Sequence, residues 1–390
     1  MKQSEAKEES ALDYVQTLSQ KIGPRPAGSP AEHQAMNFLE EKLTEFGYQL
    51  ERSPVSFAPE MIYAPFYGLG ALCLIAGGFL LPVTPIPALI LPIINLCIPQ
   101  ISRWAVHRRT TTATSENLWA ALPDLMEKRR LIICAHVDSG KISGLPNPTW
   151  IKLFQQFLFF GQRIAIFLSL IAVSHLLGFR LPDELFTAIK GLVLLLGGLW
   201  FSLDLVDQFG QSGKYSPGAN DNASGVGVAL ELAKILAVKP PSQFEVAFLF
   251  TGAEETGLHG AREFAKRLDA ERDVVINLDM VGTGGQLFYV TGDGTISILR
   301  TDKRLNQVIL KAERNARPAW YTVRSGDFAA FLQQGIRAAS LELRAGKDPG
   351  SHYHTRYDQF SKIDPESLTY MIRVLKFILA FYEDEFKKTE

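Results

Sequence analysis

The sequence predicts an α/β fold: a mixed, mostly parallel sheet with helices on both faces, interrupted by two inserted transmembrane helical hairpins. Two observations carry this prediction. From residue 206 onward, short apolar runs alternate with amphipathic segments, an order typical of a parallel sheet covered on both faces. Two long apolar blocks, 61–101 and 150–205, interrupt the polar remainder of the 390-residue chain. This length allows one large domain or two ordinary ones.

Charge and cysteine usage narrow the class of protein. The formal net charge is −1 and no long basic block occurs, so the sequence does not indicate a nucleic-acid-binding protein. Cys73, Cys97 and Cys134 lie in apolar runs, which argues against a disulfide framework or a cysteine-based zinc site. Residues 1–10 lack the apolar core of a secretory signal peptide, so none is expected. The oligomeric state is left open.

The first 60 residues have the pattern of a soluble segment. Gly23-Pro24-Arg25-Pro26 breaks a helical pattern. Ser29 precedes Pro30 as an N-cap precedes a first helical residue, and Gly47 stands where a helix commonly ends. The expected elements are a helix over 11–22, a helix from Ser29 towards Phe46 and a strand over 48–57.

The block at 61–101 predicts the first membrane hairpin. Tyr63 to Leu81 contains no charged residue, and neither does Pro85 to Ile101. A helix that crosses a membrane needs about 20 apolar residues. The first run is long enough, whereas the second is short and interrupted by prolines, so a re-entrant pair would also fit.

The block at 150–205 predicts the second hairpin. Trp150 to Phe160 is expected along the membrane interface, Ile164 to Phe179 as a strained crossing and Leu185 to Leu203 as the return. Arg163 and Lys190 lie near the ends of these runs, where long side chains can reach the headgroups. The alternative is a set of buried core helices in a soluble protein, but four such runs in one chain favour the membrane.

Three soluble pieces, 1–60, 102–149 and 206–390, are expected to form one domain around these hairpins. The last piece is the most regular. Its expected elements are a helix after Asp221, a strand over 244–250, a helix over 261–268, strands over 274–278, 286–290 and 338–341, and a long helix from Asp364.

Candidate ligands follow three apolar runs that resemble buried strands. The run 131–135 leads into His136 and Asp138, the run 246–250 into Glu254 and Glu255, and the run 274–278 into Asp279. In open α/β sheets, ligands bind beyond the carboxyl ends of the strands. These side chains are therefore expected to meet at one edge of the sheet.

The residue types at these strand ends suit a divalent metal. Histidine and carboxylate ligands without thiolates fit zinc, and also cobalt or manganese. His136 and Asp138 are two residues apart and share a face of an extended segment, so Asp138 can hold the far ring nitrogen of His136. The adjacent Glu254 and Glu255 point in different directions, so one can bind metal while the other transfers protons.

Each candidate also has a purely structural explanation. Asp221 stands at the start of an amphipathic helix, where its carboxylate could cap free backbone N–H groups. The pair Glu254-Glu255 could be a solvated helix start, and His136 a hydrogen-bonded core histidine. The combination of these residues favours the metal site.

Six motifs occur in order along the soluble pieces: Gly23-Pro24-Arg25 with 27–30, Ala135–Ser139, Gly218–Gly225, Gly252–Leu258, Asn277–Gly282 and Tyr353–Asp358. In these motifs the chain resembles the di-zinc aminopeptidases of the bacterial leucyl aminopeptidase and aminopeptidase Y type. That family also contains glutaminyl cyclases and the protease-like domain of transferrin receptors. The resemblance covers most of the soluble sequence but not the apolar blocks, so it implies a zinc-exopeptidase-like fold in a membrane-embedded member.

The resemblance implies two Zn²⁺ ions per chain and a role for each matching residue. Asp221 would bridge the two ions, His136 and Asp279 would complete the ligands of one, and Glu255 and His354 those of the other. Glu254 would be the general base and acid, and Asp138 the orienting residue.

Three further positions concern the same resemblance. His354 is chosen over His352 because it begins the His-Thr-x-x-Asp pattern, and neither His352 nor His259 is assigned a role. The family often has a Ser-Asp-His-like segment beside the substrate pocket, whereas Phe328 follows Asp327 here. This departure leaves the substrate specificity open.

The order of the motifs constrains the membrane topology. The three soluble pieces must fold on one side, so each apolar block crosses an even number of times or only dips in. Arg103, Arg108, Arg109 and Lys152 flank the crossings on the catalytic side, whereas the opposite loops hold only Arg180. The positive-inside rule then predicts a multi-pass protein of the cell membrane with a cytoplasmic catalytic domain.

The leading hypothesis is a membrane-anchored, zinc-dependent aminopeptidase that acts on peptides or small amides. The first alternative is a glutaminyl cyclase-like enzyme on the same fold. The second is a non-catalytic membrane scaffold with a peptidase-like domain, against which the complete ligand set argues.

Overall fold

The structure, a computed structural model, describes residues 9–57, 64–107, 113–123, 129–145, 148–210, 213–294, 298–321, 324–345 and 352–387. The chain divides into two compact units. The sheet unit comprises Met1–Pro59, Thr111–Ile142 and Tyr215–Glu390, and the helical unit comprises Glu60–Thr110 and Ser143–Lys214. The chain therefore leaves the sheet unit twice and returns to it twice.

The sheet unit is built on a nine-stranded mixed sheet in the order β1-β2-β4-β3-β5-β9-β6-β7, with β8 paired to β6. The central strands β4, β3, β5 and β9 are parallel, and β1, β2 and β6 pair antiparallel with their neighbours towards the edges. The strands are β1 (Gln49–Phe57), β2 (Ala113–Ala121), β3 (Arg130–His136), β4 (Glu245–Thr251), β5 (Asp273–Leu278), β6 (Gln286–Asp293), β7 (Leu299–Arg300), β8 (Arg317–Tyr321) and β9 (Arg337–Arg344).

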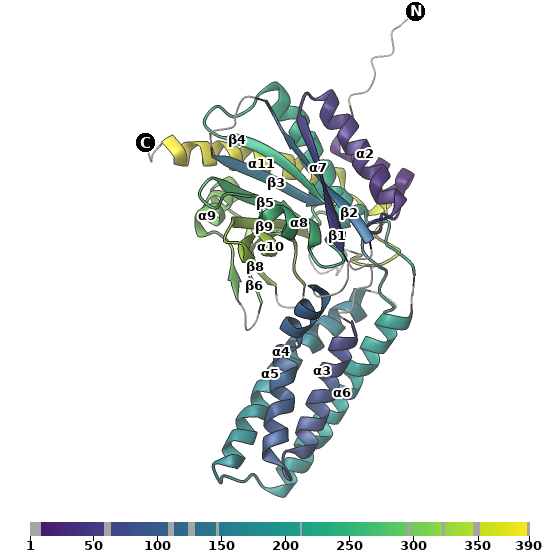
Figure 1. The fold of residues 1–390 in the computed structure, drawn as a ribbon, viewed down its shortest axis with the longest axis vertical. Helices are drawn as coiled ribbons and strands as arrows, with labels where there is room; N and C mark the ends of the chain where they lie inside the picture. Colours follow the sequence, from purple (N-terminus) through teal and green to yellow (C-terminus); the bar gives the residue numbers. More distant parts are fainter. Residues whose placement is uncertain are drawn as a thin grey trace, which may run out of the picture. The chain divides into compact units, whose positions relative to one another are not determined.

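Helices cover both faces of this sheet, as the alternation of its side chains requires. On β3, Leu131 and Ile133 join the larger core cluster with α1, α2, α7, α9 and α11, whereas Ile132 and Cys134 join the smaller cluster with α8 and α10. Figure 1 shows helices on both faces of the sheet. The helices are α1 (Ala11–Gln16), α2 (Pro30–Glu45), α7 (Gly225–Val238), α8 (His259–Ala265), α9 (Lys303–Ala312), α10 (Asp327–Gln333) and α11 (Pro365–Lys387), with shorter turns η1 (Thr17–Ile22), η2 (Ala219–Ser224) and η3 (Phe360–Lys362).

The expected elements occur in this sheet unit with few changes. The single helix expected over 11–22 is α1 followed by the π-helical turn η1. The Ser29 side chain accepts a hydrogen bond from the Glu32 backbone N–H, as an N-cap should. Strand β2 was not expected, because its buried face includes the polar residues Ser115 and Asn117, which obscure the apolar alternation.

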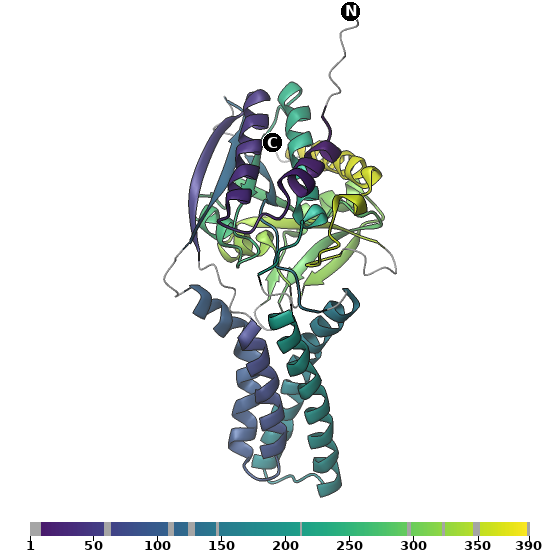
Figure 2. The ribbon, with the colours of Figure 1, turned by 90° about the vertical axis from the view of Figure 1, so that its right-hand side faces the viewer.

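The helical unit consists of two hairpins joined by short turns, α3 with α4 and α5 with α6 (Figure 2). The bounds are α3 (Ala64–Leu80), α4 (Pro85–His107), α5 (Pro148–Leu176) and α6 (Asp183–Gly210). The expectation of a separate interfacial segment over 150–160 is wrong, since α5 is continuous across it. No proline follows Pro148 in α5, so nothing in its backbone breaks the helix.

Small residues let these helices approach one another closely. A Cβ atom added to Gly161 would lie 2.5 Å from the Trp200 ring, and one added to Gly70 would lie 2.8 Å from the Asn95 amide. The indole of Trp200 is thus packed between α3 and α5 in the interior of the bundle. Glycine at such contacts is typical of helices packed within a membrane.

Two stretches of the helical unit, Thr149–Leu176 and Asp183–Gln208, are long and apolar enough to cross a membrane. The apolar stretches of the other hairpin, Tyr67–Leu80 and Pro85–Ile98, are shorter. A core helix of a soluble protein can pass the same test of length and composition, but it would be mostly buried. In the two longer helices only 33% of the most apolar window is buried, and Leu195 remains 67% exposed.

Candidate metal centre

The sheet brings the carboxyl ends of three parallel strands to one edge. β3 ends at His136 and β4 at Thr251, and these two residues are partners in the strand register. Glu254 and Glu255 lie in the turn after β4, and Asp279 directly follows β5. The strand order thus explains how residues more than 100 positions apart in the sequence come together.

The five predicted ligands form two triads that share Asp221. One triad is His136, Asp221 and Asp279 and the other is Asp221, Glu255 and His354, with ligand atoms within 4.8 Å of one another in each. Asp221 Oδ1 lies 3.2 Å from His136 Nε2, and Oδ2 lies 3.7 Å from His354 Nε2. His354 Nε2 also lies 2.9 Å from Glu255 Oε2. Asp221 therefore presents one oxygen to each triad, as a carboxylate shared by two cations would.

The backbone around Asp221 is held by a residue from the far end of the sequence. The backbone N–H groups of Asn220 and Asp221 donate to Asp358 Oδ1 and Oδ2 at 2.7 and 3.0 Å. The peptide bond between Asp221 and Asn222 is cis. The capping explanation for Asp221 is wrong, because Asn222 Oδ1 and not the Asp221 carboxylate accepts the Gly225 backbone N–H at the start of α7, at 3.1 Å. Asp358, the last residue of the His-Thr-x-x-Asp motif, instead fixes the loop that carries the shared carboxylate.

Asp138 holds both the imidazole and the neighbouring turn. His136 Nδ1 lies 3.1 Å from the Asp138 backbone oxygen and 3.6 Å from its carboxylate. The same carboxylate accepts the backbone N–H groups of Glu254 at 3.1 Å and Glu255 at 3.0 Å. Asp138 therefore leaves His136 Nε2 facing Asp221 and, in addition, sets the turn that carries both glutamates. The sequence pattern had indicated only the contact with the ring.

The centre concentrates negative charge where water is scarce. Burial raises the pKa of Glu254 well above its usual range, and burial with repulsion from Asp221 raises the pKa of Asp279 to about 7. Burial opposes ionisation of Asp221 too, but the hydrogen bond from His136 and the positive charges of His136, His354 and Arg324 together outweigh it and lower the pKa of Asp221. Buried carboxylates in this number need a compensating cation.

Two further observations fit cations between these side chains. Glu255 Oε1 is buried and has no hydrogen-bond partner within the described ranges. A Cβ atom added to Gly140 would lie 2.6 Å from both Glu255 Oε1 and His354 Nε2, so only glycine keeps the space beside the second triad open. Imidazole and carboxylate donors around such a space suit zinc.

Arg25 is a positioning residue that the sequence pattern indicated only as part of a helix-breaking motif. Its guanidinium is wholly buried and donates to backbone carbonyl oxygens on both sides of the centre, those of Leu18, Gly23, Val137, Pro217 and Gly218. Burial lowers its pKa to about 10, so it remains a cation at neutral pH. Arg25 thus ties the segment after β3 to the segment before Asp221.

The remaining candidates lie outside the triads. Neither His259 nor His352 belongs to a metal-ligating group among the described residues. Phe328 is fully buried and packs edge-on against Tyr321. Asp327 accepts a hydrogen bond from the Thr251 hydroxyl at 2.5 Å behind β4. The residue that replaces the family histidine is therefore part of the core and not of an open surface.

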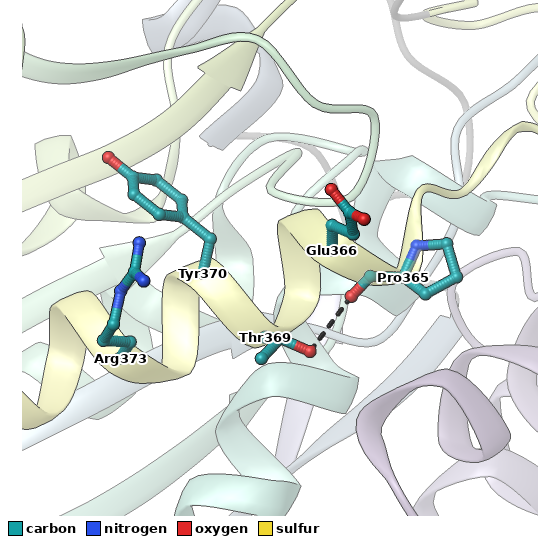
Figure 3. Close-up of a pocket in the computed structure, with 5 residues that line it drawn as sticks. All are labelled: Pro365, Glu366, Thr369, Tyr370 and Arg373. Carbon is teal, nitrogen blue, oxygen red and sulfur yellow. Dashed lines mark hydrogen bonds between the residues drawn. The ribbon is translucent and has the colours of Figure 1, made fainter.

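A surface pocket of about 490 Å³ lies along the first turns of α11 (Figure 3). Its lining residues are Pro365, Glu366, Thr369, Tyr370 and Arg373. The Thr369 hydroxyl donates to the Pro365 carbonyl oxygen at 3.2 Å, as the dashed line shows. None of these residues belongs to the triads, so this pocket is separate from the metal centre.

Comparison with known proteins gives a family and a fold. Residues 203–378 match the model of Peptidase family M28. Aminopeptidase YwaD of Bacillus subtilis is 33% identical over 169 residues, which are 40% of this chain and 35% of that protein. Curated relatives are thus matched over only part of their length. The family match contains Asp221, Glu254, Glu255, Asp279 and His354, whereas His136 and Asp138 lie before it.

Solved structures are similar over nearly the whole chain. A zinc aminopeptidase from Bacillus subtilis has a TM-score of 0.55 at 16% identity and covers 96% of this chain and 94% of its own. A glutaminyl cyclase from Porphyromonas gingivalis has a TM-score of 0.56 at 15% identity, with 96% and 97% covered. At these identities the similarity concerns the fold. Residues 203–378 are thus similar to peptidase family M28, and the chain shares the fold of these solved peptidase and cyclase structures.

Proposed function

We propose that the chain is a membrane-anchored, zinc-dependent aminopeptidase that removes amino-terminal residues from peptides. The observation that carries the proposal is the pair of triads that share Asp221, one oxygen facing each histidine. The family match and the similarity to aminopeptidases support the same reaction.

The residues of the two triads fit a pair of divalent cations. His136, Asp221 and Asp279 would hold one, and Asp221, Glu255 and His354 the other. Two bound Zn²⁺ ions supply Lewis acidity to the substrate carbonyl and lower the pKa of an attacking water. Asp138 and Arg25 keep the ligands in place from outside the triads.

Glu254 is the proposed proton carrier. It forms a close group with His136 and Glu255, yet it is not a member of either triad. Its carboxylate would take a proton from the attacking water as oxygen adds to the carbonyl carbon, and would return it to the amine nitrogen as the C–N bond breaks. Burial raises the pKa of Glu254, which makes its carboxylate a stronger base than an exposed glutamate. The surrounding carboxylates would attract the free ammonium group at the amino end of a peptide.

Hydrolysis of aminoacyl anilides by the purified, zinc-loaded chain tests this proposal. We expect Glu254→Gln to reduce the rate about 10²- to 10⁴-fold while the bound zinc stays unchanged. Anilides whose amino group is acetylated should not be cleaved, and cleavage of both forms at equal rates would contradict an aminopeptidase. A matched control, Glu263→Gln, removes an exposed carboxylate of α8 and should leave the rate unchanged.

Cyclisation of amino-terminal glutamine is the second candidate, because the glutaminyl cyclase has nearly the same TM-score as the aminopeptidase. Mass spectrometry of a peptide that begins with glutamine separates the two reactions. Loss of ammonia without cleavage of the chain indicates cyclisation, and release of free glutamine indicates hydrolysis. A chain that binds no zinc at near-stoichiometric levels would instead be a scaffold.

We also propose that the helical unit anchors the chain as a multi-pass membrane protein with its sheet unit in the cytoplasm. The length, composition and exposure of α5 and α6 support the crossing. The proposed side of the membrane depends on four basic residues in the sequence, Arg103, Arg108, Arg109 and Lys152. Arg108 and Arg109 lie outside the described residues, and Arg103 and Lys152 are described in backbone only. A reporter inserted at Arg180 should be accessible from outside the cell, and one at the C-terminus only after lysis.

A further inference from the structure

A second concave site lies in the sheet unit, away from the residues of the two triads. This basic pocket has a volume of about 570 Å³ and is bordered by β7, the start of α9, the end of α10 and the start of β9. Its positively charged residues are Arg300, Lys303, Arg304 and Arg337, and Ile336 and Leu332 contribute apolar surface. Such a volume lies within the range of small-molecule sites.

The sequence conceals this concentration of charge. The whole chain has a net charge of −1 and no long basic run, yet the fold brings Arg337 beside a cluster more than 30 positions earlier. The one acidic residue of the lining, Asp302, is the N-cap of α9 and accepts the Leu305 backbone N–H at 2.8 Å. The Asp302 carboxylate is thus engaged in capping α9. The lining holds four cationic side chains and this one carboxylate.

These four cations differ from six arginines of the sheet unit that pair with carboxylates. Arg52, Arg130, Arg267, Arg272, Arg324 and Arg344 each form an ion pair with a carboxylate. Within the described ranges, no such ion pair involves the cations of the basic pocket. Arg337 donates to the Glu271 backbone oxygen at 3.1 Å, and Arg300 lies 5.3 Å above the centre of the Trp320 ring. Neither contact neutralises the charge.

We propose that the basic pocket binds a phosphate-bearing anion. Guanidinium groups donate paired hydrogen bonds that match phosphate oxygens, and several cations around one hollow favour a multiply charged ligand over a single carboxylate. Leu332 and Ile336 would contact an apolar part of the same ligand. The site is independent of the proposed peptidase activity.

Trp320 provides a local test, because Arg300 lies over its ring. Inorganic pyrophosphate is titrated into the detergent-solubilised full chain while tryptophan emission is recorded, and Trp320→Phe identifies the part of the signal that arises at this residue. We expect saturable binding that Arg300→Gln with Arg304→Gln weakens about tenfold or more. The control pair Lys239→Gln with Lys376→Gln removes two exposed cations elsewhere and should bind as the parent does.

Two outcomes of this titration would contradict the proposal, and a further experiment identifies the source of the anion. Equal binding by both double variants, or a response that survives in Trp320→Phe, would place the anion elsewhere and overturn the proposal. Reconstitution in phosphatidylcholine vesicles with or without phosphatidylglycerol then separates two sources of the ligand. If the ligand is a lipid headgroup, phosphatidylglycerol should change Trp320 emission before pyrophosphate is added. If the ligand is a free phosphate compound, phosphatidylglycerol should leave the emission unchanged. No step of this experiment measures peptide hydrolysis, so its outcome is separate from that of the aminopeptidase.

Discussion

Asp221 is the residue on which both halves of the candidate metal centre depend. Its two oxygens face His136 and His354, and its backbone N–H is tied to Asp358. A substitution that removes the Asp221 carboxylate therefore affects both triads at once, whereas a substitution of Asp279 affects only one triad. Residue pattern predicted the ligand types and their places at the strand ends. It could not predict the tie to Asp358, because no periodicity links positions 137 residues apart.

Asp221→Asn should abolish both cation sites, since the amide supplies one neutral oxygen where a shared carboxylate is needed. Elemental analysis should then find zinc lost from both sites, and anilide hydrolysis should stop. Asp279→Asn should leave one cation bound. If Asp221→Asn kept both zinc ions, Asp221 would not be the bridging ligand.

Gly140→Ala should close the space beside the second triad, because its Cβ atom would lie 2.6 Å from Glu255 Oε1 and His354 Nε2. We expect zinc content to fall by one ion and activity to be lost, with little change in the stability of the zinc-free chain. Gly198→Ala is the matched control: nothing lies within 4 Å of the added atom, and alanine favours a helix. Full zinc content in Gly140→Ala would show that the second site lies elsewhere.

Among the elements, the parallel strands β3, β4 and β5 determine where the chemistry takes place. Apolar runs followed by histidine or acidic residues were enough to predict this edge, because parallel strands present their carboxyl ends together. The smaller elements β7, α9, β8 and α10 were not predicted. β7, β8 and α10 are short, and β8 has two exposed residues at its start, so their patterns contain too few repeats to be distinguished from loops. α9 is longer, and its buried Leu305, Val308 and Ile309 recur at helical spacing, so the sequence did contain a signal for this helix.

The loops that join these elements depend on Arg25. Arg25→Lys would keep the charge but cannot reach five carbonyl oxygens with one ammonium group. Leaving buried carbonyl groups without donors should destabilise the sheet unit by about 3 kcal/mol. Thermal unfolding followed by circular dichroism measures this, with the exposed Arg373→Lys as control. An unchanged midpoint for Arg25→Lys would show that the carbonyl groups find other donors.

For the whole molecule, bound cations and stability should be linked. The ligands of the triads come from the second and third pieces of the sheet unit, which come together only in the folded state. Cations that bind this assembled site therefore stabilise the folded state. Zinc at about 100 times its dissociation constant contributes about 2.7 kcal/mol. Chelation should therefore lower the unfolding temperature of the parent chain, and added zinc should restore it. Asp221→Asn should show no such dependence on zinc.

The places where the helical hairpins enter the sheet unit have a practical consequence. Phe57 and Ala113 are paired across β1 and β2, and Lys141 forms a β-bridge with Tyr215. At each insertion the segments that leave and re-enter the sheet unit are thus neighbours, and a turn of about four residues could join them. Excising both hairpins and grafting such turns in their place should give a detergent-free protein that still loads zinc. The helical unit would then be two insertions in short connections of the sheet unit, and the sheet unit could be crystallised without it.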